Sequence, residues 1–415
     1  MADQELVRRA FSAREQRVRA YFGAHGGRLA EACHRMAERF ARGGRILAFG
    51  CGAAATDAQH ISVEFVHPVI VGKRALPAIA LPNDGPSLLS SLLADPTALF
   101  TRHLQLIGKP EDIAVGFTFT TGDHADLSVR AALKEAEAQG MLALAFTGGA
   151  ADLDAHHIFP CDDPDPFVVQ EVHETAYHML WELVHVFFEH RGLLSGRRQE
   201  MHHDVGASSF LYPFLDEQEK DLDAVLEEVA GSIAKKADDI IEIRAASAAR
   251  DAERFLTAAA AVRERLEDGG KVLAFGNGGS ATDAQDLVTD LIAPPAGLRP
   301  QPALSLTNEE AVVTAVGNDV GYDNVFARQV IAYGETPDIA VGISTSGNSR
   351  NVLAALEEAR RRGLLCIGLA GYGGGRMVES GVCDHAFVID HEYIPRIQEA
   401  QATQYHLLRR LIDEP

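Results

Sequence analysis

The stretch FGNGGSATDAQDLVTD, from Phe275 to Asp290, has a counterpart earlier in the chain, FGCGAAATDAQHISVE, from Phe49 to Glu64. In both stretches a short apolar run ends in a glycine turn, and a helical pattern follows the turn. A turn of this kind between a buried strand and a helix is typical of parallel α/β folds. The sequence therefore predicts a strand–turn–helix unit that occurs twice.

The repetition extends over most of the 415 residues. DIAVG occurs at 112–116 and again at 338–342, and VQEVHETAYH at 169–178 matches IQEAQATQYH at 397–406. Matching blocks in the same order indicate a tandem duplication. We expect one domain at residues 1–191 (copy one), a linker at 192–215 and a second domain at 216–415 (copy two).

Within each copy, apolar runs alternate with helical patterns, which predicts a parallel sheet. The fold class we expect is α/β: two doubly wound parallel sheets flanked by helices, each a flavodoxin-like or Rossmann-like three-layer sandwich. Two N-terminal helical segments are expected to precede each sheet, at 4–23 and 27–43 in copy one and at 217–245 and 250–268 in copy two. A long helix is expected to close each copy, near 167–191 and 395–412.

Composition narrows the function classes. The net charge is -21 with no basic patch, which argues against a nucleic-acid partner. No apolar run has transmembrane length, the N-terminus does not resemble a signal peptide, and the five cysteines lack metal-type CxxC spacing. We therefore expect a cytoplasmic protein with reduced thiols and no membrane partner.

A hydroxyl-rich turn, STSGNS at 344–349, follows the run DIAVGI and opens a helical pattern. The free N–H groups and the dipole of a helix N-terminus attract anions. Ser344, Thr345, Ser346 and Ser349 add hydroxyl donors, and Gly347 allows close backbone approach. A plain helix cap needs only one hydroxyl. The turn therefore predicts a phosphate site in copy two.

The turn GNGGSA offers Asn277 and Ser280, which we expect to contact the sugar or its phosphate. Copy one carries Cys51 and Ala54 at the matching places, and its longer loop FTFTTGDHADLS contains Asp123, whose charge opposes phosphate. The phosphate site is therefore expected to be degenerate in copy one.

Copy one instead carries a possible metal or acid–base cluster. His60 and Glu64 share a helix face because they are four residues apart, and Gln170 and His178 lie on the last helix. Such a set can hold a divalent ion such as zinc, and Glu64 and His178 can equally exchange protons. The alternative is an ordinary helical ion pair beside a core histidine. Eight helical residues rise about 12 Å, which separates Gln170 from His178 on a straight helix.

The matching residues of copy two form a weaker second metal set, in which shorter side chains with carboxylate oxygens favour harder ions. They are Asp286, Asp290, Gln398 and His406.

Each half resembles the SIS (sugar isomerase) domain, and specifically the phosphoheptose isomerase (sedoheptulose 7-phosphate isomerase) family. The resemblance lies in GNGGSATDAQ, ISTSGNSRNVLAAL and RIQEAQATQYH in copy two, and in DAQHISVEFV and VQEVHETAYH in copy one. It implies aldose–ketose isomerisation of a sugar phosphate through an enediol, with zinc as a possible metal and no organic cofactor.

The resemblance also implies roles for the residues. Glu64 and His178 would be the acid–base pair, and the zinc set would be His60, Glu64, Gln170 and His178. The substrate would be held by Asn277, Ser280, Ser344, Thr345, Ser346 and Ser349.

Members of the family are tetramers, so a homodimer of this chain would form a pseudo-tetramer of SIS domains. An alternative function remains open because the family's residues are divided between the two copies. The chain would then be a non-catalytic phosphosugar-binding, scaffold or regulatory protein.

Overall fold

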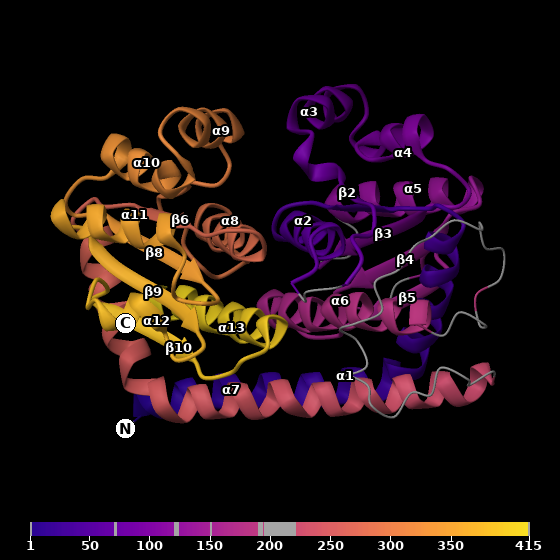
Figure 1. Cartoon of the computed structure of the whole chain (residues 1–415), viewed down its shortest axis with the longest axis horizontal. Helices are drawn as coiled ribbons and strands as arrows, with labels where there is room; N and C mark the ends of the chain where they lie inside the picture. The colour runs from indigo at the N-terminus through magenta and orange to yellow at the C-terminus, as the bar shows by residue number, and fades with distance from the viewer. Residues whose placement is uncertain are drawn as a thin grey trace. The chain divides into compact units, whose positions relative to one another are not determined.

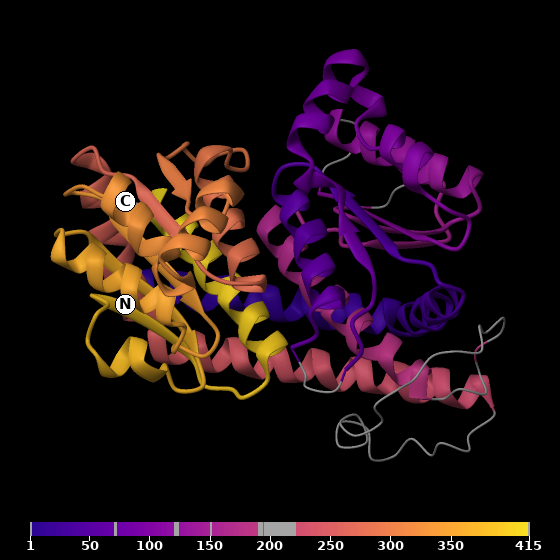
Figure 2. The ribbon, with the colours of Figure 1, turned by 45° about the horizontal axis from the view of Figure 1, so that its top comes forward.

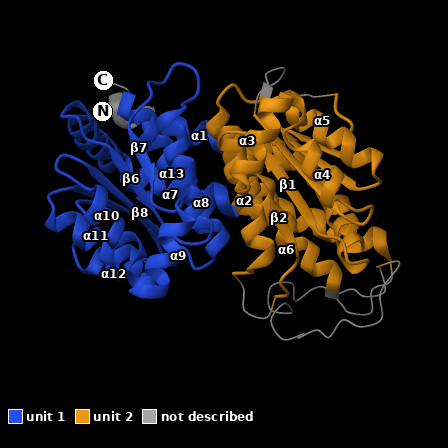
Figure 3. Ribbon diagram, turned by 90° about the horizontal axis from the view of Figure 1, so that it is seen from above, with its two compact units in different colours: residues 1–16, 239–415 blue, residues 17–238 orange. Residues whose placement is uncertain are grey.

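The computed structural model describes residues 2–69, 73–119, 124–149, 152–189, 194 and 221–413. Two compact units are present (Figure 3): residues 1–16 with 239–415 form unit 1, and residues 17–238 form unit 2. Of the predicted linker, 192–215, all but Leu194 lies outside the described residues, and so does Asp123. The domain limits 1–191 and 216–415 remain a prediction.

Unit 2 contains a five-stranded sheet in the order β2-β1-β3-β4-β5, in which every neighbouring pair is parallel. The strands are β1 (Ile46–Gly50), β2 (Ala78–Ala80), β3 (Ile113–Thr118), β4 (Leu142–Thr147) and β5 (His157–Pro160). The helices after β1 are α2 (Ala53–Val66), η1 (Leu81–Asn83), α3 (Gly85–Ala94), η2 (Pro96–Ala98), α4 (Thr101–Ile107), α5 (His124–Ala138) and α6 (Pro166–Glu189).

Unit 1 repeats this topology with the order β10-β9-β8-β6-β7, again all parallel. The strands are β6 (Val272–Phe275), β7 (Ala303–Ser305), β8 (Ile339–Ser344), β9 (Leu365–Gly371) and β10 (His385–Ile389). The helices are α8 (Gly279–Ile292), α9 (Glu310–Asp319), η4 (Tyr322–Asn324), α10 (Val325–Tyr333), α11 (Arg350–Arg361), α12 (Gly375–Glu379) and α13 (Ile394–Asp413).

Each sheet is buried on both faces, which explains the continuous apolar runs of its strands. In unit 1, Val272 packs in a cluster with side chains of α8 and α13, and its neighbour Leu273 packs in another with side chains of α10 and α11. Successive strand residues point to opposite faces, so helices lie on both sides of the sheet (Figures 1 and 2). The predicted doubly wound α/β fold is confirmed in both units.

The N-terminal helices differ from the prediction, because α1 (Ala2–Ala41) and α7 (Leu222–Glu267) are each continuous where two segments were expected. A Cβ added to Gly26 would lie 3.8 Å from atoms of Ala230 and Ile233, so Gly26 lies at a packed contact with α7. Glycine at this position does not end the helix, which packing against α7 continues to support.

Strands β5 and β10 were not predicted. Both are edge strands, with a single neighbour each, and β5 alternates buried and half-buried residues. A short strand that is buried on alternate residues lacks the continuous apolar run that identified the central strands.

None of the helices in the described part of the chain combines the length and apolar character needed to cross a membrane.

His173 on α6 provides a test of the core of unit 2. Its ring is fully buried beside the rings of Phe146, Phe119 and Tyr21, and burial lowers its pKa to about 3. In the unfolded chain the pKa of histidine is near 6.5, so the unfolded state alone binds this proton between about pH 6.5 and pH 3. Stability is therefore lost as the pH falls through this range.

We expect wild-type protein to lose about 2 kcal/mol more unfolding free energy than His173→Gln between pH 7 and pH 5. Glutamine is the residue that copy two carries at the matching place, Gln401. Denaturant titration at both pH values measures the difference, and His67→Gln, at an exposed histidine, is the control that should follow wild type. Equal pH dependence in wild type and His173→Gln would contradict the assignment.

Candidate functional site

In each unit the chain runs on in opposite directions from one pair of neighbouring strands, β1 with β3 and β6 with β8. In unit 1 the helices that follow this pair pack on opposite faces, since α8 lies in one core cluster and α11 in the other. Ligands of open α/β sheets bind in the crevice beyond the strand ends at such a point. The GNGGSA turn follows β6 and the STSGNS turn follows β8, so both predicted phosphosugar motifs lie at the strand ends of this pair.

The STSGNS turn leaves the N-terminus of α11 open to an anion. Ser349 is the N-cap residue, yet its side chain makes no capping hydrogen bond within the described part of the chain. Its Oγ lies 2.9 Å from Oγ of Ser344 instead. The first-turn N–H groups of a helix need an acceptor, and that of Val352 has one in Oδ1 of Asn351 at 3.0 Å, which leaves the earlier groups of the turn. The hydroxyl pair and these N–H groups together form a site suited to phosphate.

A close backbone approach fixes the shape of this turn. Gly347 has φ +63°, and a Cβ there would lie 2.1 Å from the carbonyl oxygen of Gly374. The backbone N–H of Asn348 donates to Oγ of Ser346 (3.1 Å), and Oδ1 of Asn348 accepts from the N–H of Arg376 (3.0 Å). The structure therefore adds Asn348 as a residue that shapes the turn, which the sequence reasoning missed.

The GNGGSA turn places Asn277 beside α11. Nδ2 of Asn277 donates to Oδ1 of Asn351 at 2.9 Å, which joins the end of β6 to the first turn of α11. Ser280 is buried in the first turn of α8, and a Cβ on Gly276 would lie 2.3 Å from its carbonyl oxygen. Sequence reasoning found Asn277 and Ser280 and missed Asn351.

Unit 2 keeps the backbone of this turn and changes its side chains. A Cβ on Gly50 would lie 2.3 Å from the carbonyl oxygen of Ala54, as at the matching turn of unit 1. Cys51 stands at the place of Asn277, and buried Asp126 lies in the first turn of α5 with its carboxylate paired to Arg130 at 2.6 Å. A buried carboxylate at this helix N-terminus disfavours a second anion.

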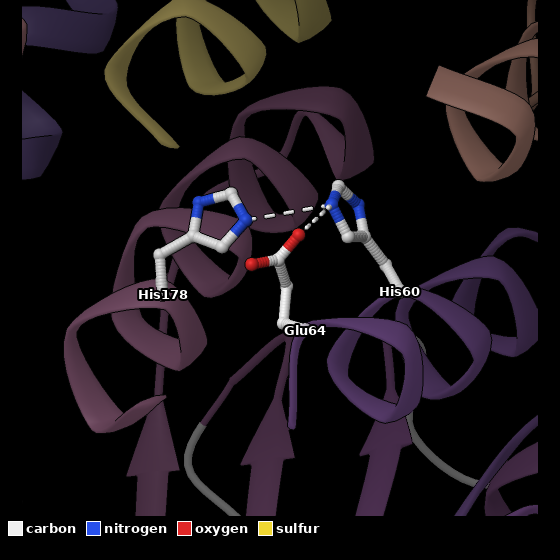
Figure 4. Close-up of side chains that lie close together, drawn as sticks. All are labelled: His60, Glu64 and His178. Atoms are coloured by element: carbon white, nitrogen blue, oxygen red, sulfur yellow. Dashed lines mark hydrogen bonds and ion pairs between the residues drawn. The ribbon is translucent and has the colours of Figure 1, made fainter. Parts of the chain in front are cut away.

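The histidine cluster is assembled within unit 2 from α2 and α6 (Figure 4). Nε2 of His60 lies 3.4 Å from Nε2 of His178 and 3.8 Å from Oε1 of Glu64. All three side chains are buried, and one ligand atom from each lies within 4.8 Å of the others. The structure therefore brings together three of the four residues of the predicted zinc set.

His60 is held in its neutral form. Burial lowers its pKa well below the usual value, and the neighbouring His178 lowers it further. Nδ1 of His60 lies 3.9 Å from Oε1 of Glu174, so a second carboxylate faces the other ring nitrogen. A carboxylate behind a histidine is a common means of orienting a metal ligand. Glu174 was not among the predicted site residues.

Gln170, the fourth member, is fixed to the start of α2. Its Nε2 donates to the carbonyl of Ala53 and to Oγ1 of Thr56, both at 3.3 Å. These acceptors lie one to two turns before His60. The hydrogen bonds attach α6 to α2 near the glycine turn.

The matching cluster of unit 1 combines two carboxylates and one imidazole. Nε2 of His406 lies 3.2 Å from Oδ2 of Asp286 and 3.4 Å from Oδ2 of Asp290, and all three side chains are buried. Tyr405 donates its hydroxyl to Oδ2 of Asp286 at 2.8 Å. Burial raises the pKa of Asp290, and the charge of Asp286 raises it further. Gln398 is buried eight residues before His406 on α13.

The two clusters differ in the ions they suit. Two imidazole nitrogens with one carboxylate are typical of zinc and other borderline metals, whereas two carboxylates with one imidazole suit harder ions. The cluster of unit 2 can also transfer protons, since it places a carboxylate beside a neutral imidazole.

Comparison with known proteins agrees with this architecture. The SIS domain family matches residues 12–148 and 237–371. The phosphoheptose isomerase of Rhodospirillum rubrum is 46% identical over 158 residues, which cover 38% of this chain and 83% of that protein. The phosphoheptose isomerase of Solidesulfovibrio magneticus is 46% identical over 178 residues, covering 42% and 86%.

Two solved structures share the fold over nearly the whole chain. The C-terminal domain of glucosamine-fructose-6-phosphate aminotransferase from Francisella tularensis has a TM-score of 0.56 at 11% identity, covering 97% of this chain and 94% of that one. The tagatose-6-phosphate ketose/aldose isomerase of Escherichia coli has a TM-score of 0.54 at 13% identity, covering 98% and 91%. At such identities the likeness concerns the fold alone. The family match and the close relatives together show that the chain belongs to the SIS domain family, whose domain it carries twice.

Proposed function

We propose that the chain is an aldose–ketose isomerase that acts on a sugar phosphate, with sedoheptulose 7-phosphate as the substrate to test first. The relatives named phosphoheptose isomerase support an isomerase, because the aligned part of this chain covers more than four fifths of each. The observation that carries the proposal is the buried cluster of His60, Glu64 and His178, whose two Nε2 atoms lie 3.4 Å apart.

The proposal assigns proton transfer to Glu64 and His178. As a carboxylate, Glu64 is the base that removes the proton from the carbon next to the carbonyl, which gives an enediol or enediolate. His178 is the acid that donates a proton to the carbonyl oxygen as the enediol forms. Glu64 then returns its proton to the former carbonyl carbon while His178 takes the hydroxyl proton from the other carbon, so both groups are regenerated. A carboxylate and a histidine in opposite starting protonation states suffice for this exchange.

Phosphate binding is assigned to the STSGNS turn of unit 1. Ser344, Thr345, Ser346 and Ser349 belong to the turn that leads into α11, and the phosphate of the substrate supplies the charge that a helix N-terminus attracts. Binding energy from a group remote from the reacting carbons is a general means by which an enzyme orients its substrate. Asn277 and Ser280 are assigned to the sugar.

Zinc is part of the proposal. The donor set fits this ion, because two imidazole nitrogens and a carboxylate oxygen converge in a buried site and catalytic zinc commonly has three protein ligands. His60, Glu64 and His178 would hold it, and the family resemblance adds Gln170. When bound, zinc polarises the carbonyl or diol oxygens. The set of Asp286, Asp290, Gln398 and His406 is assigned to a second, harder cation.

The same proposal includes a cytoplasmic location and a homodimer that forms a pseudo-tetramer of SIS domains. The location rests on the composition and the cysteine usage of the sequence, and the homodimer rests on the family resemblance.

A second candidate function is a non-catalytic phosphosugar-binding or regulatory protein. Residue replacements favour it: Cys51 and Ala54 in unit 2, and Asp286 and Asp290 at the places of His60 and Glu64 in unit 1. Binding of sugar phosphates with neither turnover nor bound metal would select this function.

We expect Glu64→Gln to lower kcat for sedoheptulose 7-phosphate isomerisation by about 10²- to 10⁴-fold, the usual contribution of a general base. A coupled steady-state assay measures the rate, and Glu253→Gln, at an exposed glutamate on α7, is the matched control that should retain wild-type activity. Equal rates for wild type and Glu64→Gln would refute the role of Glu64.

We expect Ser346→Ala to raise KM by roughly 10- to 100-fold with a smaller change in kcat, since a hydrogen bond to a charged group is lost. The same assay over a range of substrate concentrations separates the two constants. Ser90→Ala, which removes an exposed hydroxyl on α3, is the control. An unchanged KM would remove Ser346 from the phosphate site.

We expect the purified protein to contain zinc, and His178→Ala to lose it because one of three ligands is removed. Elemental analysis by mass spectrometry measures the content without depending on activity. Asp290→Asn, which alters only the cluster of unit 1, should keep the zinc. Equal zinc in wild type and His178→Ala would show that the metal binds elsewhere.

A further inference from the structure

A hydrogen-bonded triad in unit 1 joins Asn277 to two residues, Tyr322 and Asn351, that have no role in the function described so far. Tyr322 of η4 donates its hydroxyl to Oδ1 of Asn277 at 3.0 Å. Nδ2 of Asn351 donates to the same oxygen at 2.8 Å, and Nδ2 of Asn277 donates back to Oδ1 of Asn351 at 2.9 Å. Three elements that are distant in sequence, the β6–α8 turn, η4 and α11, therefore meet at one amide.

The orientation of both amides follows from the backbone of α11. The N–H of Val352 donates to Oδ1 of Asn351 at 3.0 Å, so the Nδ2 of Asn351 must point toward Asn277. Only an oxygen of Asn277 can accept from that Nδ2 and from the Tyr322 hydroxyl. Reversing either amide would set donor against donor. Asn277 is thus held with Oδ1 saturated and one hydrogen of Nδ2 still available.

The surroundings of Tyr322 fit a role beside the glycine turn and not in the core. The side chain of Tyr322 is 57% exposed, although its hydroxyl is fixed to Asn277. The preceding Gly321 has φ +100° and ψ 148°, a conformation that essentially only glycine adopts. Asp323 and Arg350 form an ion pair at 3.7 Å, a second link between η4 and the start of α11. The hydroxyl group of Tyr322 therefore fixes the side chain beside Asn277, and packing in the hydrophobic core contributes little.

Unit 2 lacks the triad at all three positions. A Cβ on Gly116 would contact Val129 and Leu133, and one on Gly342 would contact Val352 and Leu356, so Ser128 matches Asn351. Cys51 matches Asn277, and its Sγ lies 3.7 Å from Oγ of Ser128. The first residue of η2 is Pro96, where η4 begins with Tyr322. The amide pair and its tyrosine are present only in the unit that keeps the phosphate turn.

We propose that the free Nδ2–H of Asn277 donates to an oxygen of the sugar portion of the phosphosugar, and that Tyr322 and Asn351 are positioning residues that hold the amide in this orientation. The inference rests on the proposed function, since it concerns the same ligand class. Tyr322 and Asn351 act through Asn277. The phosphate itself remains bound by the serine and threonine hydroxyls and by the N-terminus of α11.

The experiment is a double-mutant cycle on binding, performed on the full chain. Isothermal titration calorimetry in a Glu64→Gln background measures sedoheptulose 7-phosphate binding without turnover, and inorganic phosphate is the second probe. We expect Tyr322→Phe to weaken sugar-phosphate binding by about three- to tenfold, the effect of one lost hydrogen bond, and to leave phosphate binding unchanged. In an Asn277→Ala background, Tyr322→Phe should have no further effect.

Two variants support the cycle. Asn351→Ser introduces the residue found at the matching place in copy one and should reproduce the selective loss. Tyr333→Phe, at another partly exposed tyrosine of unit 1, is the matched control and should bind both ligands as the parent does. Thermal unfolding of each variant shows whether the fold is retained.

The possible results separate this inference from the proposed function. Three results would overturn the positioning role of Tyr322. Tyr322→Phe could weaken the binding of sugar phosphate and of inorganic phosphate equally, it could weaken neither, or it could have the same effect in the Asn277→Ala background as in the parent. If wild type binds the sugar phosphate and does not isomerise it, the proposed isomerase activity is wrong. The affinities of the Tyr322→Phe variants for the two ligands still decide the role of Tyr322. If the parent binds no sugar phosphate, both fail.

Discussion

The divergence of two helices from neighbouring parallel strands is the constraint on which both candidate sites depend. In each unit the strand that begins the sheet lies beside the third strand in chain order, β1 beside β3 and β6 beside β8. Because the following helices pack on opposite faces, the strand ends are left uncovered between them. The glycine turns, the hydroxyl turn and the helices that carry the histidine and aspartate clusters all begin at this edge or pack beside it.

The two units share the backbone conformation of the turns at this edge of the sheet and differ in the side chains that these turns carry. Gly50 and Gly276 have the same close approach, 2.3 Å from a would-be Cβ to the carbonyl oxygen four residues later, so neither position accepts another residue. Side chains in the same turns carry no such restriction. Asn277 is replaced by Cys51, and the imidazole and longer carboxylate of His60 and Glu64 are replaced by two aspartates. Duplication thus preserved the geometry while the ligand groups diverged.

Central strands and the phosphate turn could be predicted because their signals are local. A strand buried on both faces, such as 339–344, is a continuous apolar run, and a hydroxyl turn between such a run and a helix indicates its own chemistry. The triad at Asn277 could not be predicted, because its members are 45 and 74 positions apart and meet only in the folded unit. The edge strands and the continuity of α1 could not be predicted for a related reason, because their hydrophobic patterns depend on which neighbouring element covers them.

The two long helices have a consequence for how the chain can be dissected. The compact unit that contains the second sheet includes residues 1–16, and the unit that contains the first sheet includes residues 17–238, with the start of α7. Val7 and Phe11 belong to the same buried cluster as Phe255 and Phe387. A fragment cut at the repeat boundary would separate these aromatic side chains and expose apolar surface. A truncation that keeps each buried cluster whole therefore has to be planned from the compact units, residues 1–16 with 239–415 and residues 17–238, as well as from the repeat.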